Sequence, residues 1–519
     1  MEDLDRRIAA TYGVTVDSSE WLSAGARPER IVLAADELAR TIGDRPAAAP
    51  PDDEPVWPAF PPPPVPPATA AARRAAIARL LSWAADRGVW YEPLDFTVDD
   101  DGACTARARR DLAAGERVLV IPRTAMILHD ALEATATGAV DAFGPQLEHG
   151  STTLAVWLAL EHDRADSPWR SYLDTLPARL DELPCYRRGD DVEELRGTMA
   201  RYFCATAGKR LVDLRELLRA ELRDRIPLPR YGWACATVTA RGYRVTIGGR
   251  DHYALIPVSD LLDHRPGDTQ WVFDDEADAM IYTALRPLPA GAIVHARYGG
   301  LGNARLLHSY GFTLDDNPDD EAGLVFGPAP SVRVALTAHM LWRVPLAGPT
   351  LLPVTREVDA HLTRALSLAR LRAAGLGELL AALGAGGLVR GEIGWLGPEV
   401  ERAALAELAT AARAGLARLA DHPAADPAWG AEPDRTAWQR ACARIRRGER
   451  AVLEDVHAFA VAAADDLATA EPAALAARAA AIAADAPAAE RMRRVYLQAI
   501  VTGLEAEAEA EAEPEAEPA

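Results

Sequence analysis

The sequence predicts an α+β protein in which short strands in small sheets are followed by an all-helical region. Two segments in the middle of the chain alternate apolar and polar residues around turn residues, which is typical of hairpins. From about residue 336 onward the apolar residues recur at helical spacing instead. The chain has 519 residues, of which 49% are hydrophobic, so we expect several folding units rather than one ordinary core.

The first 45 residues carry a weak helical pattern, and we expect a small helical segment there, with apolar positions at Ile31, Leu33, Leu38 and Ile42. Residues 46–70 are rich in proline and cannot form ladder hydrogen bonds, so they are predicted to be an extended linker. A stiff spacer is favoured over a docking peptide for an aromatic groove. A helix is expected to resume at Ala71.

Three segments between residues 100 and 290 are predicted to be strands or hairpins. Arg117–Pro122 follows a turn and is rich in branched apolar residues. Tyr243–Val258 reads as a hairpin that turns at Gly248 and Gly249. A second hairpin is expected to pair Thr269–Phe273 with Ala279–Ala284.

Helical periodicity occupies most of the remaining chain. We expect a helical insert at about residues 150–240 and a helical domain over residues 329–503, in which one clean stripe comprises Leu405, Leu408, Ala412, Leu416 and Leu419. Residues 504–519 repeat Glu, Ala and Pro without an apolar face, so this tail is predicted to be disordered.

Charge and cysteine content limit the classes of function. The net charge of -21 argues against a broad nucleic-acid or anionic-membrane surface. No apolar stretch of membrane-spanning length and no secretory signal is visible, so a cytoplasmic location is expected. The five cysteines form no CxxC pair, and we expect neither disulfides nor a metal site. Lys209 is the single lysine, so self-methylation of side-chain amines would be confined to it.

Common catalytic motifs are missing from the sequence, which has no phosphate-binding GxxxxGK[ST] loop, no GxSxG elbow and no HExxH. One constellation of chemically useful residues remains. The segment Ile256–His264 ends a predicted strand and carries Asp260, Asp263 and His264, and a second segment runs from Tyr298 to Phe312. Taken singly, each of these residues is more often a packing or surface residue than a catalytic one.

The spacing Tyr298-Gly299, Asn303, Leu306-Leu307 and Tyr310-Gly311-Phe312 resembles that of SET-domain protein methyltransferases. The chain is similar to a bacterial-type member of the branch typified by Rubisco large-subunit lysine methyltransferase. That branch also has an upstream signature matched by Ser167, Trp169, Tyr172, Leu173, Leu176 and Pro177, and a downstream helical domain matched at Arg444, Glu449 and Leu453. The resemblance covers about residues 80–456. It implies a SET domain over residues 71–328 and a helical substrate-binding domain after it.

This resemblance implies transfer of a methyl group from S-adenosylmethionine to a side-chain nitrogen of a protein or peptide, with lysine as the favoured acceptor and histidine as the alternative. Tyr298 aligns with the catalytic tyrosine, whose phenol would orient the acceptor amine. The residues that align with cofactor-binding positions are Asp130, Arg241, Asp260, Asp263 and His264. The helical domain would dock the substrate, with no nucleic acid or membrane involved.

Two departures from the family pattern open a second hypothesis. Asp263 stands where the family has asparagine, which removes two donors and adds a charge. The stretch Ala103-Cys104-Thr105 lacks the glycines of the turn that approaches the cofactor. The alternative function is therefore a catalytically impaired SET-fold protein that binds a partner. A purely structural protein, and recruitment of the target by residues 1–45, also stay open.

Overall fold

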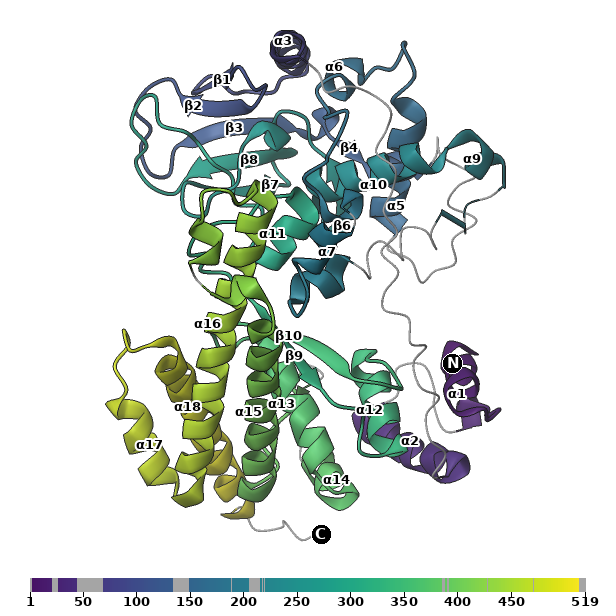
Figure 1. The fold of residues 1–519 in the computed structure, drawn as a ribbon, viewed down its shortest axis with the longest axis vertical. Coiled ribbons are helices and arrows are strands. Elements are labelled where there is room, and N and C mark those ends of the chain that lie inside the picture. Colours follow the sequence, from purple (N-terminus) through teal and green to yellow (C-terminus); the bar gives the residue numbers. More distant parts are fainter. Residues whose placement is uncertain are drawn as a thin grey trace, which may run out of the picture.

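The computed structural model describes residues 2–20, 27–43, 69–133, 149–187, 189–204, 215–216, 218, 220–384, 388–389, 392–426, 428–469 and 471–512. Figure 1 shows two lobes, an α+β lobe at the top of the view and a helical lobe below it. Their hydrophobic cores are separate. One core contains apolar residues between Ile77 and Ala296, and the other is formed mainly by residues from Ala322 to Val501.

The α+β lobe contains three small antiparallel sheets. β1 (Leu94–Val98) pairs with β2 (Cys104–Ala108), the second sheet has the order β3 (Arg117–Pro122), β8 (Ala279–Ala284), β7 (Thr269–Asp274), and the third has the order β4 (Ile127–Leu128), β6 (Arg250–Leu255), β5 (Gly242–Ile247). Both predicted hairpins are therefore confirmed. Gly248 and Gly249 between β5 and β6 have φ of 55° and 76°, the left-handed conformation that a two-residue hairpin turn favours.

Helices surround these sheets, and several of them lie in the predicted insert (Figure 1). The lobe comprises α3 (Ala70–Asp86), α4 (His129–Glu133), α5 (His149–Glu161), α6 (Arg170–Leu173), α7 (Asp190–Glu193), α9 (Ala220–Arg225), α10 (Leu228–Arg241) and α11 (Asn303–Tyr310), with 3-10 turns η2 (Arg123–Ala125), η4 (Pro184–Tyr186) and η5 (Ser259–Leu261). Thr69 caps α3 by accepting from the backbone N–H of Ala72. Residues 46–68 of the predicted linker lie outside the described residues.

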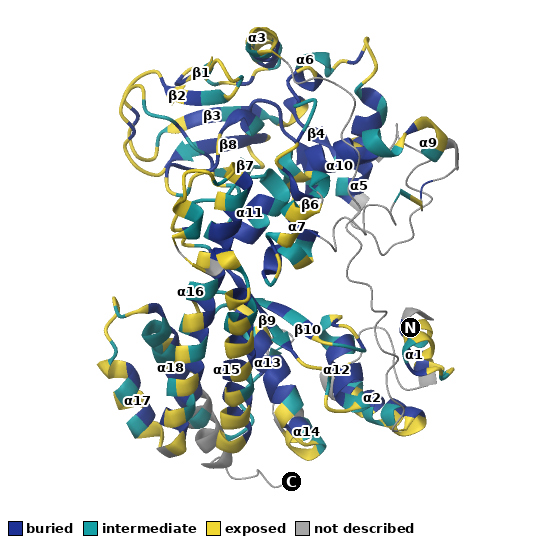
Figure 2. Ribbon diagram, in the orientation of Figure 1, coloured by how far each residue is buried: buried dark blue, intermediate teal, exposed yellow. Residues whose placement is uncertain are grey.

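The helical lobe contains α12 (Val332–Trp342), α13 (Ala360–Ala373), α14 (Leu376–Gly384), α15 (Pro398–Ala420), α16 (Ala437–Asp466), α17 (Pro472–Ala481) and α18 (Ala488–Ala512), with 3-10 turns η6 (Pro423–Ala425), η7 (Trp429–Ala431) and η8 (Leu467–Thr469). The sequence analysis did not predict two short strand pairs. These are β9 (Ala322–Phe326) with β10 (Thr350–Val354), and β11 (Leu388–Val389) with β12 (Glu392–Ile393). Each strand is too short for a clear alternation of apolar and polar residues. Figure 2 shows that the long helices bury one face each.

The N-terminal segment forms two helices, α1 (Glu2–Tyr12) and α2 (Pro28–Ile42), with the 3-10 turn η1 (Ser18–Glu20) after α1. Their apolar side chains share a small core with α12, which includes Ile8, Leu38 and Leu336. The segment thus belongs to the helical lobe, although the chain enters the α+β lobe next.

The expected disorder of the tail is wrong for residues 504–512, because α18 continues to Ala512. Alanine and glutamate are both strong helix formers, so a helix that starts on packed residues can extend through them. Residues 513–519 lie outside the described residues. Within the part of the chain that the structure describes, no helix is both long and apolar enough to cross a membrane.

Buried polar contacts join the two lobes along α16. Both carboxylate oxygens of Glu449 accept from the backbone N–H of Met199, at 2.9 and 3.0 Å. The indole N–H of Trp438 donates to the carbonyl of Asp191 at 2.8 Å. Arg446 donates to the carbonyls of Glu194 and Arg196, at 2.9 and 2.6 Å. The insert of the α+β lobe is therefore bound to the central helix of the other lobe.

Candidate active site

A pocket of about 160 Å³ lies where α10 passes into β5. Its lining comes from five separate parts of the α+β lobe: Ala240, Arg241, Gly242, Tyr243, Arg244, Asp260, Trp271, Tyr298 and Tyr310. Gly242 makes the sharp passage from helix to strand feasible, because a Cβ there would lie 2.5 Å from the carbonyl oxygen of Val238. Arg241, the last residue of α10, is thereby placed at the pocket.

A buried ion pair forms the polar side of this pocket. The guanidinium of Arg241 donates to the carbonyl oxygen and to Oδ2 of Asp260, at 2.9 and 3.2 Å. The hydroxyl of Tyr172 also donates to Oδ2, at 3.0 Å. Asp260 lies in η5, the turn that follows Val258. The φ of Val258 is 72°, which is unfavourable for a β-branched residue and turns the chain sharply.

Two atoms of this ion pair are left without a hydrogen-bond partner in the described part of the chain. Among the described residues, Oδ1 of Asp260 and Nε of Arg241 are buried and have no hydrogen-bond partner. Unsatisfied buried polar atoms are costly and commonly mark a place where a ligand or water binds. Arg241 and Asp260 thus bring one unsatisfied donor and one unsatisfied acceptor to the wall of the pocket, both shielded from solvent.

Tyr298 lies on the opposite side of the ion pair and is half-buried. Its hydroxyl donates to the carbonyl of Leu262 at 2.7 Å, and its ring centroid lies 4.8 Å from that of Tyr310. Burial raises the pKa of the Tyr298 phenol well above its usual range. The hydroxyl is therefore protonated at neutral pH and can act as a hydrogen-bonding group, not as a phenolate.

His264 packs against Tyr298 and accepts a hydrogen bond from its main chain. The backbone N–H of Tyr298 donates to Nδ1 of His264 at 3.0 Å, and the two rings lie 5.0 Å apart. Because Nδ1 accepts, the neutral imidazole carries its proton on Nε2. Burial lowers the pKa of His264, which favours this neutral form.

Asp263 precedes His264 and is exposed. The surrounding lobe still desolvates its carboxyl and raises the pKa of that group. Its carbonyl oxygen accepts from the backbone N–H of Ala296 at 2.9 Å. This bond and the parallel bridge between His264 and Ala296 fix the segment beside Tyr298. Of the predicted site residues, Arg241, Asp260 and Tyr298 line the pocket, while Asp263 and His264 lie next to Tyr298 without lining it; their roles in binding or catalysis stay predictions.

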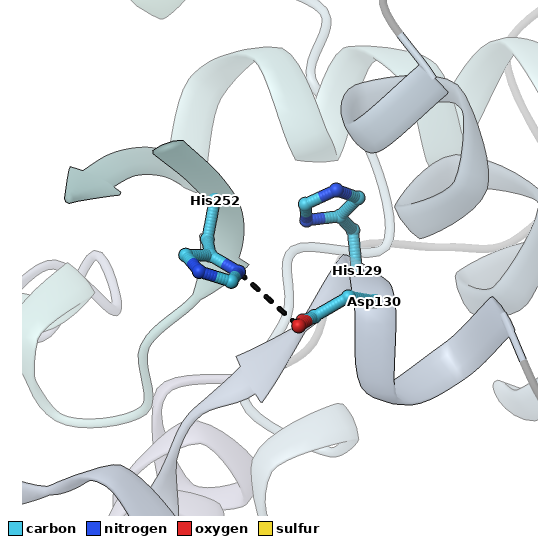
Figure 3. A group of neighbouring side chains, drawn as sticks. All are labelled: His129, Asp130 and His252. Carbon is cyan, nitrogen blue, oxygen red and sulfur yellow. Dashed lines mark ion pairs between the residues drawn. The ribbon is translucent and has the colours of Figure 1, made fainter. Parts of the chain in front are cut away.

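Asp130 is not brought to this pocket. Its carboxylate is directed at His252 on β6, with Oδ2 3.3 Å from Nδ1 of that ring, and it does not line the cavity around Arg241. Figure 3 shows Asp130 at the start of α4, facing His252 and close to His129. α4 begins at His129 and directs the Asp130 side chain toward β6, so a role of Asp130 in cofactor binding stays a prediction.

Sequence reasoning missed two residues near the site, Arg73 and Tyr310, whereas Cys104 was already expected there. Burial and the nearby Arg241 lower the pKa of Arg73, a residue of α3 that donates to the carbonyl of Thr175. Burial raises the pKa of Cys104 to about 11, and Arg73 and Asp263 both affect that thiol. The ring of Tyr310 packs against that of Tyr298 at an angle of 42°. Tyr310 belonged to a motif used only to identify the fold, and no local pattern distinguishes Arg73 from other surface arginines.

A glycine with a positive φ lies in the turn just before Cys104. Gly102 has a φ of 87°, and it lies in the turn that joins β1 to β2. Cys104 itself begins β2 and pairs with Val98. The positive φ is therefore supplied before Ala103-Cys104-Thr105, and Cys104 presents a side chain where a glycine would leave space.

No family model matches the chain. Among curated proteins it is similar to "Actin-histidine N-methyltransferase" of Canis lupus familiaris, with 28% identity over 279 residues, covering 51% of this chain and 47% of that protein. The protein of the same description from Homo sapiens is 27% identical over 299 residues, covering 55% of this chain and 49% of that protein. The chain thus matches about half the length of these relatives.

Solved structures match a larger part of the chain. One is described as the SET domain of LSMT bound to lysine and AdoHcy, with a TM-score of 0.59 and 19% identity, covering 76% of this chain and 93% of that one. Another, Rubisco LSMT bound to AdoMet, gives a TM-score of 0.57 at 19% identity, with coverage of 76% and 93%. The small sheets, the helical insert and the helical lobe that follows them are therefore the SET-domain fold.

Proposed function

We propose that this chain is an S-adenosylmethionine-dependent protein N-methyltransferase that acts on a lysine side chain. The observation that carries the proposal is the pocket in which the Tyr298 hydroxyl and the unpartnered Oδ1 of Asp260 occur among aromatic rings. A methyl transfer needs an acceptor nitrogen that is aligned and shielded from water, and these groups serve both needs.

The residues beside the pocket suit a zwitterionic amino-acid ligand. Arg73 and Arg241 would bind a carboxylate, and Asp263 and Asp260 would accept from an ammonium group. The free Nε of Arg241 is the specific observation that favours a ligand here. When bound, S-adenosylmethionine supplies a methyl group activated by its sulfonium. Structures of similar fold described as bound to AdoMet and AdoHcy support this cofactor.

Tyr298 is proposed to be the catalytic residue. Its hydroxyl is held by the carbonyl of Leu262, and its ring is held between Tyr310 and His264. A fixed, protonated phenol would orient the acceptor nitrogen and stabilise partial positive charge on the transferring carbon through its oxygen. Its role requires no proton transfer from the hydroxyl.

Lysine is favoured as the acceptor by the shape and polarity of the pocket. A long aliphatic stem would pack along the rings of Trp271, Tyr298 and Tyr310, and its amine would reach the hydroxyl of Tyr298. The similar curated proteins are described as acting on actin histidine, which keeps histidine as the alternative acceptor. The two acceptors differ in product and can be told apart chemically.

A groove between the two lobes would dock the substrate protein. It has a volume of about 970 Å³ and begins at Gly300 and Leu301, directly after Tyr298. Its carboxylates, from Asp319, Asp320, Glu321, Glu357, Asp359, Asp455 and Asp485, outnumber its arginines, Arg305, Arg356 and Arg491. A basic segment of the substrate would complement this surface.

The second candidate is a protein-binding module that has lost methyl transfer. The negative charge of Asp263 and the side chain of Cys104 favour it, because both occur where the cofactor would bind. Such a protein would keep the groove and its partner while failing to bind the cofactor. Calorimetric titration with S-adenosylhomocysteine separates the two candidates, with Asp263→Asn as the variant that removes the charge.

Transfer of a labelled methyl group from S-adenosylmethionine to proteins of a cell extract tests the enzyme reading directly. We expect labelled methyl-lysine after hydrolysis with the native chain and at least a tenfold loss with Tyr298→Phe, while the affinity for S-adenosylhomocysteine stays unchanged. Labelled methyl-histidine in place of methyl-lysine would show that histidine, the alternative, is the acceptor. Cofactor binding without any labelled product, or no binding at all, would favour the binding module.

A further inference from the structure

Three metal-binding side chains converge away from the pocket (Figure 3). His129 and Asp130 begin α4, and His252 lies on β6, far away in the sequence. One ligand atom from each of the three lies within 4.8 Å of the others. Because the donors come from segments distant in the sequence, no spacing motif reveals them.

His252 is the member of this cluster that most needs a partner. Its side chain is 10% exposed, and Nδ1 has no hydrogen-bond partner among the described residues. Nδ1 lies 3.3 Å from Oδ2 of Asp130, but the contact does not meet the geometry of a hydrogen bond. A buried ring nitrogen without a partner, directed at a carboxylate, is an observation that an ion between the two would explain.

The backbone holds these donors in place. β4 pairs with β6 through Ile127 with Leu255 and Leu128 with Ala254, directly before His129. The two segments that carry the ligands are thus neighbours in one sheet, which gives a rigid framework. The Asp130 side chain is 41% exposed, so an ion could enter from solvent and keep water in its remaining coordination positions.

We propose that His129, Asp130 and His252 form a binding site for a divalent transition metal, with Zn²⁺ as the ion of reference. Two imidazoles and one carboxylate are a donor set that suits Zn²⁺ and the neighbouring divalent ions. The bound ion would fasten the start of α4 to β6. This inference is independent of the proposed methyl transfer.

If His129 binds the ion through Nδ1, metal binding would change one hydrogen bond. Nδ1 of His129 accepts from the backbone N–H of Tyr253 at 3.1 Å. An ion bound at this nitrogen takes the same lone pair, so the N–H of Tyr253 loses its acceptor. Hydrogen exchange at this amide should therefore become faster when Zn²⁺ is bound, although the fold as a whole becomes more stable.

The test is calorimetric titration of the tag-free, chelator-treated full chain with Zn²⁺, together with the visible absorption of added Co²⁺. We expect one ion per chain, and a loss of affinity of roughly tenfold or more in both Asp130→Asn and His252→Ala. The matched control is His361→Ala, because His361 and Asp359 are also 3.3 Å apart but belong to no cluster of three donors in the described structure. This control should bind as the native chain does.

Three results would overturn the proposal. The native chain could bind no ion, its affinity could be unchanged in both variants, or His361→Ala could weaken binding as much as they do. Circular dichroism shows whether each variant is folded. If His252→Ala does not fold, Asp130→Asn still decides the matter, because its exposed side chain is replaced by one of the same size.

Discussion

The backbone N–H of Tyr298 donates to Nδ1 of His264, and the two rings lie 5.0 Å apart. This bond is one of several between the segment that ends at His264 and the segment that carries Tyr298, together with the bonds from the Tyr298 hydroxyl to Leu262 and from Ala296 to Asp263. It also determines the tautomer of His264, since a nitrogen that accepts has no proton. His264 is therefore a positioning residue for Tyr298.

Replacement of His264 by leucine should loosen Tyr298. We expect a fall in methyl transfer of about tenfold or more, because the main chain of Tyr298 loses its acceptor and the hydroxyl, although still bonded to the carbonyl of Leu262, is positioned less precisely. His264→Asn should recover much of the loss, since an asparagine oxygen can accept at a similar position. Equal turnover in the native chain and His264→Leu would contradict this role.

The buried pair of Arg241 and Asp260 should be strongly coupled in stability. Arg241→Met alone leaves Asp260 buried without a countercharge, which costs about 3–5 kcal/mol. Asp260→Asn alone leaves the guanidinium unpaired in the same way. The double variant should lose clearly less than the sum of the two, as measured by denaturant unfolding. Additive losses would show that the pair is not coupled.

The free energy of unfolding should fall as pH rises, because the carboxyl of Glu449 is buried at its contact with Met199. Burial raises the pKa of Glu449 from 4.5 to about 8. In the unfolded chain the group loses its proton near its ordinary pKa, so between these two values the folded state holds more protons and is destabilised as pH rises. The stability that protonated Glu449 contributes to the folded state is fully present at low pH and is lost by about pH 8.

The measurement is unfolding by denaturant at several pH values, compared between the native chain and Glu449→Gln. Glutamine keeps an acceptor for the N–H of Met199 but has no proton to lose. The difference between the two stability curves should amount to a few kcal/mol, on the order that a raised carboxyl pKa allows. Parallel curves would show that Glu449 does not titrate in this range.

Gly448 should tolerate no side chain. A Cβ at this position would collide with the carboxylate of Asp320, which accepts from the backbone N–H of Asn303 at 2.8 Å. Gly448→Ala should therefore cost about 1–3 kcal/mol and disturb the start of α11. The matched control is Gly327→Ala, since a Cβ at Gly327 meets nothing within 4 Å. Equal thermal stability of the two variants would contradict the prediction.

The parts of the fold with a local cause could be predicted from the sequence. Two glycines with positive φ form the turn between β5 and β6, and their requirement is visible in the residues themselves. Asp130 shows the opposite case, because its direction depends on where α4 begins and on β6, which is distant in sequence. Arg73 likewise reaches the site only through the packing of α3.

The contacts that join α16 to the insert through Glu449, Trp438 and Arg446 have a mechanical consequence. Breaking any of them would leave a buried polar group without a hydrogen-bond partner. Opening and closing of the two lobes about the groove is therefore costly. The groove therefore keeps its width before a partner arrives. Association would be governed by diffusion and orientation onto a preformed concave surface, with little delay from a closing motion.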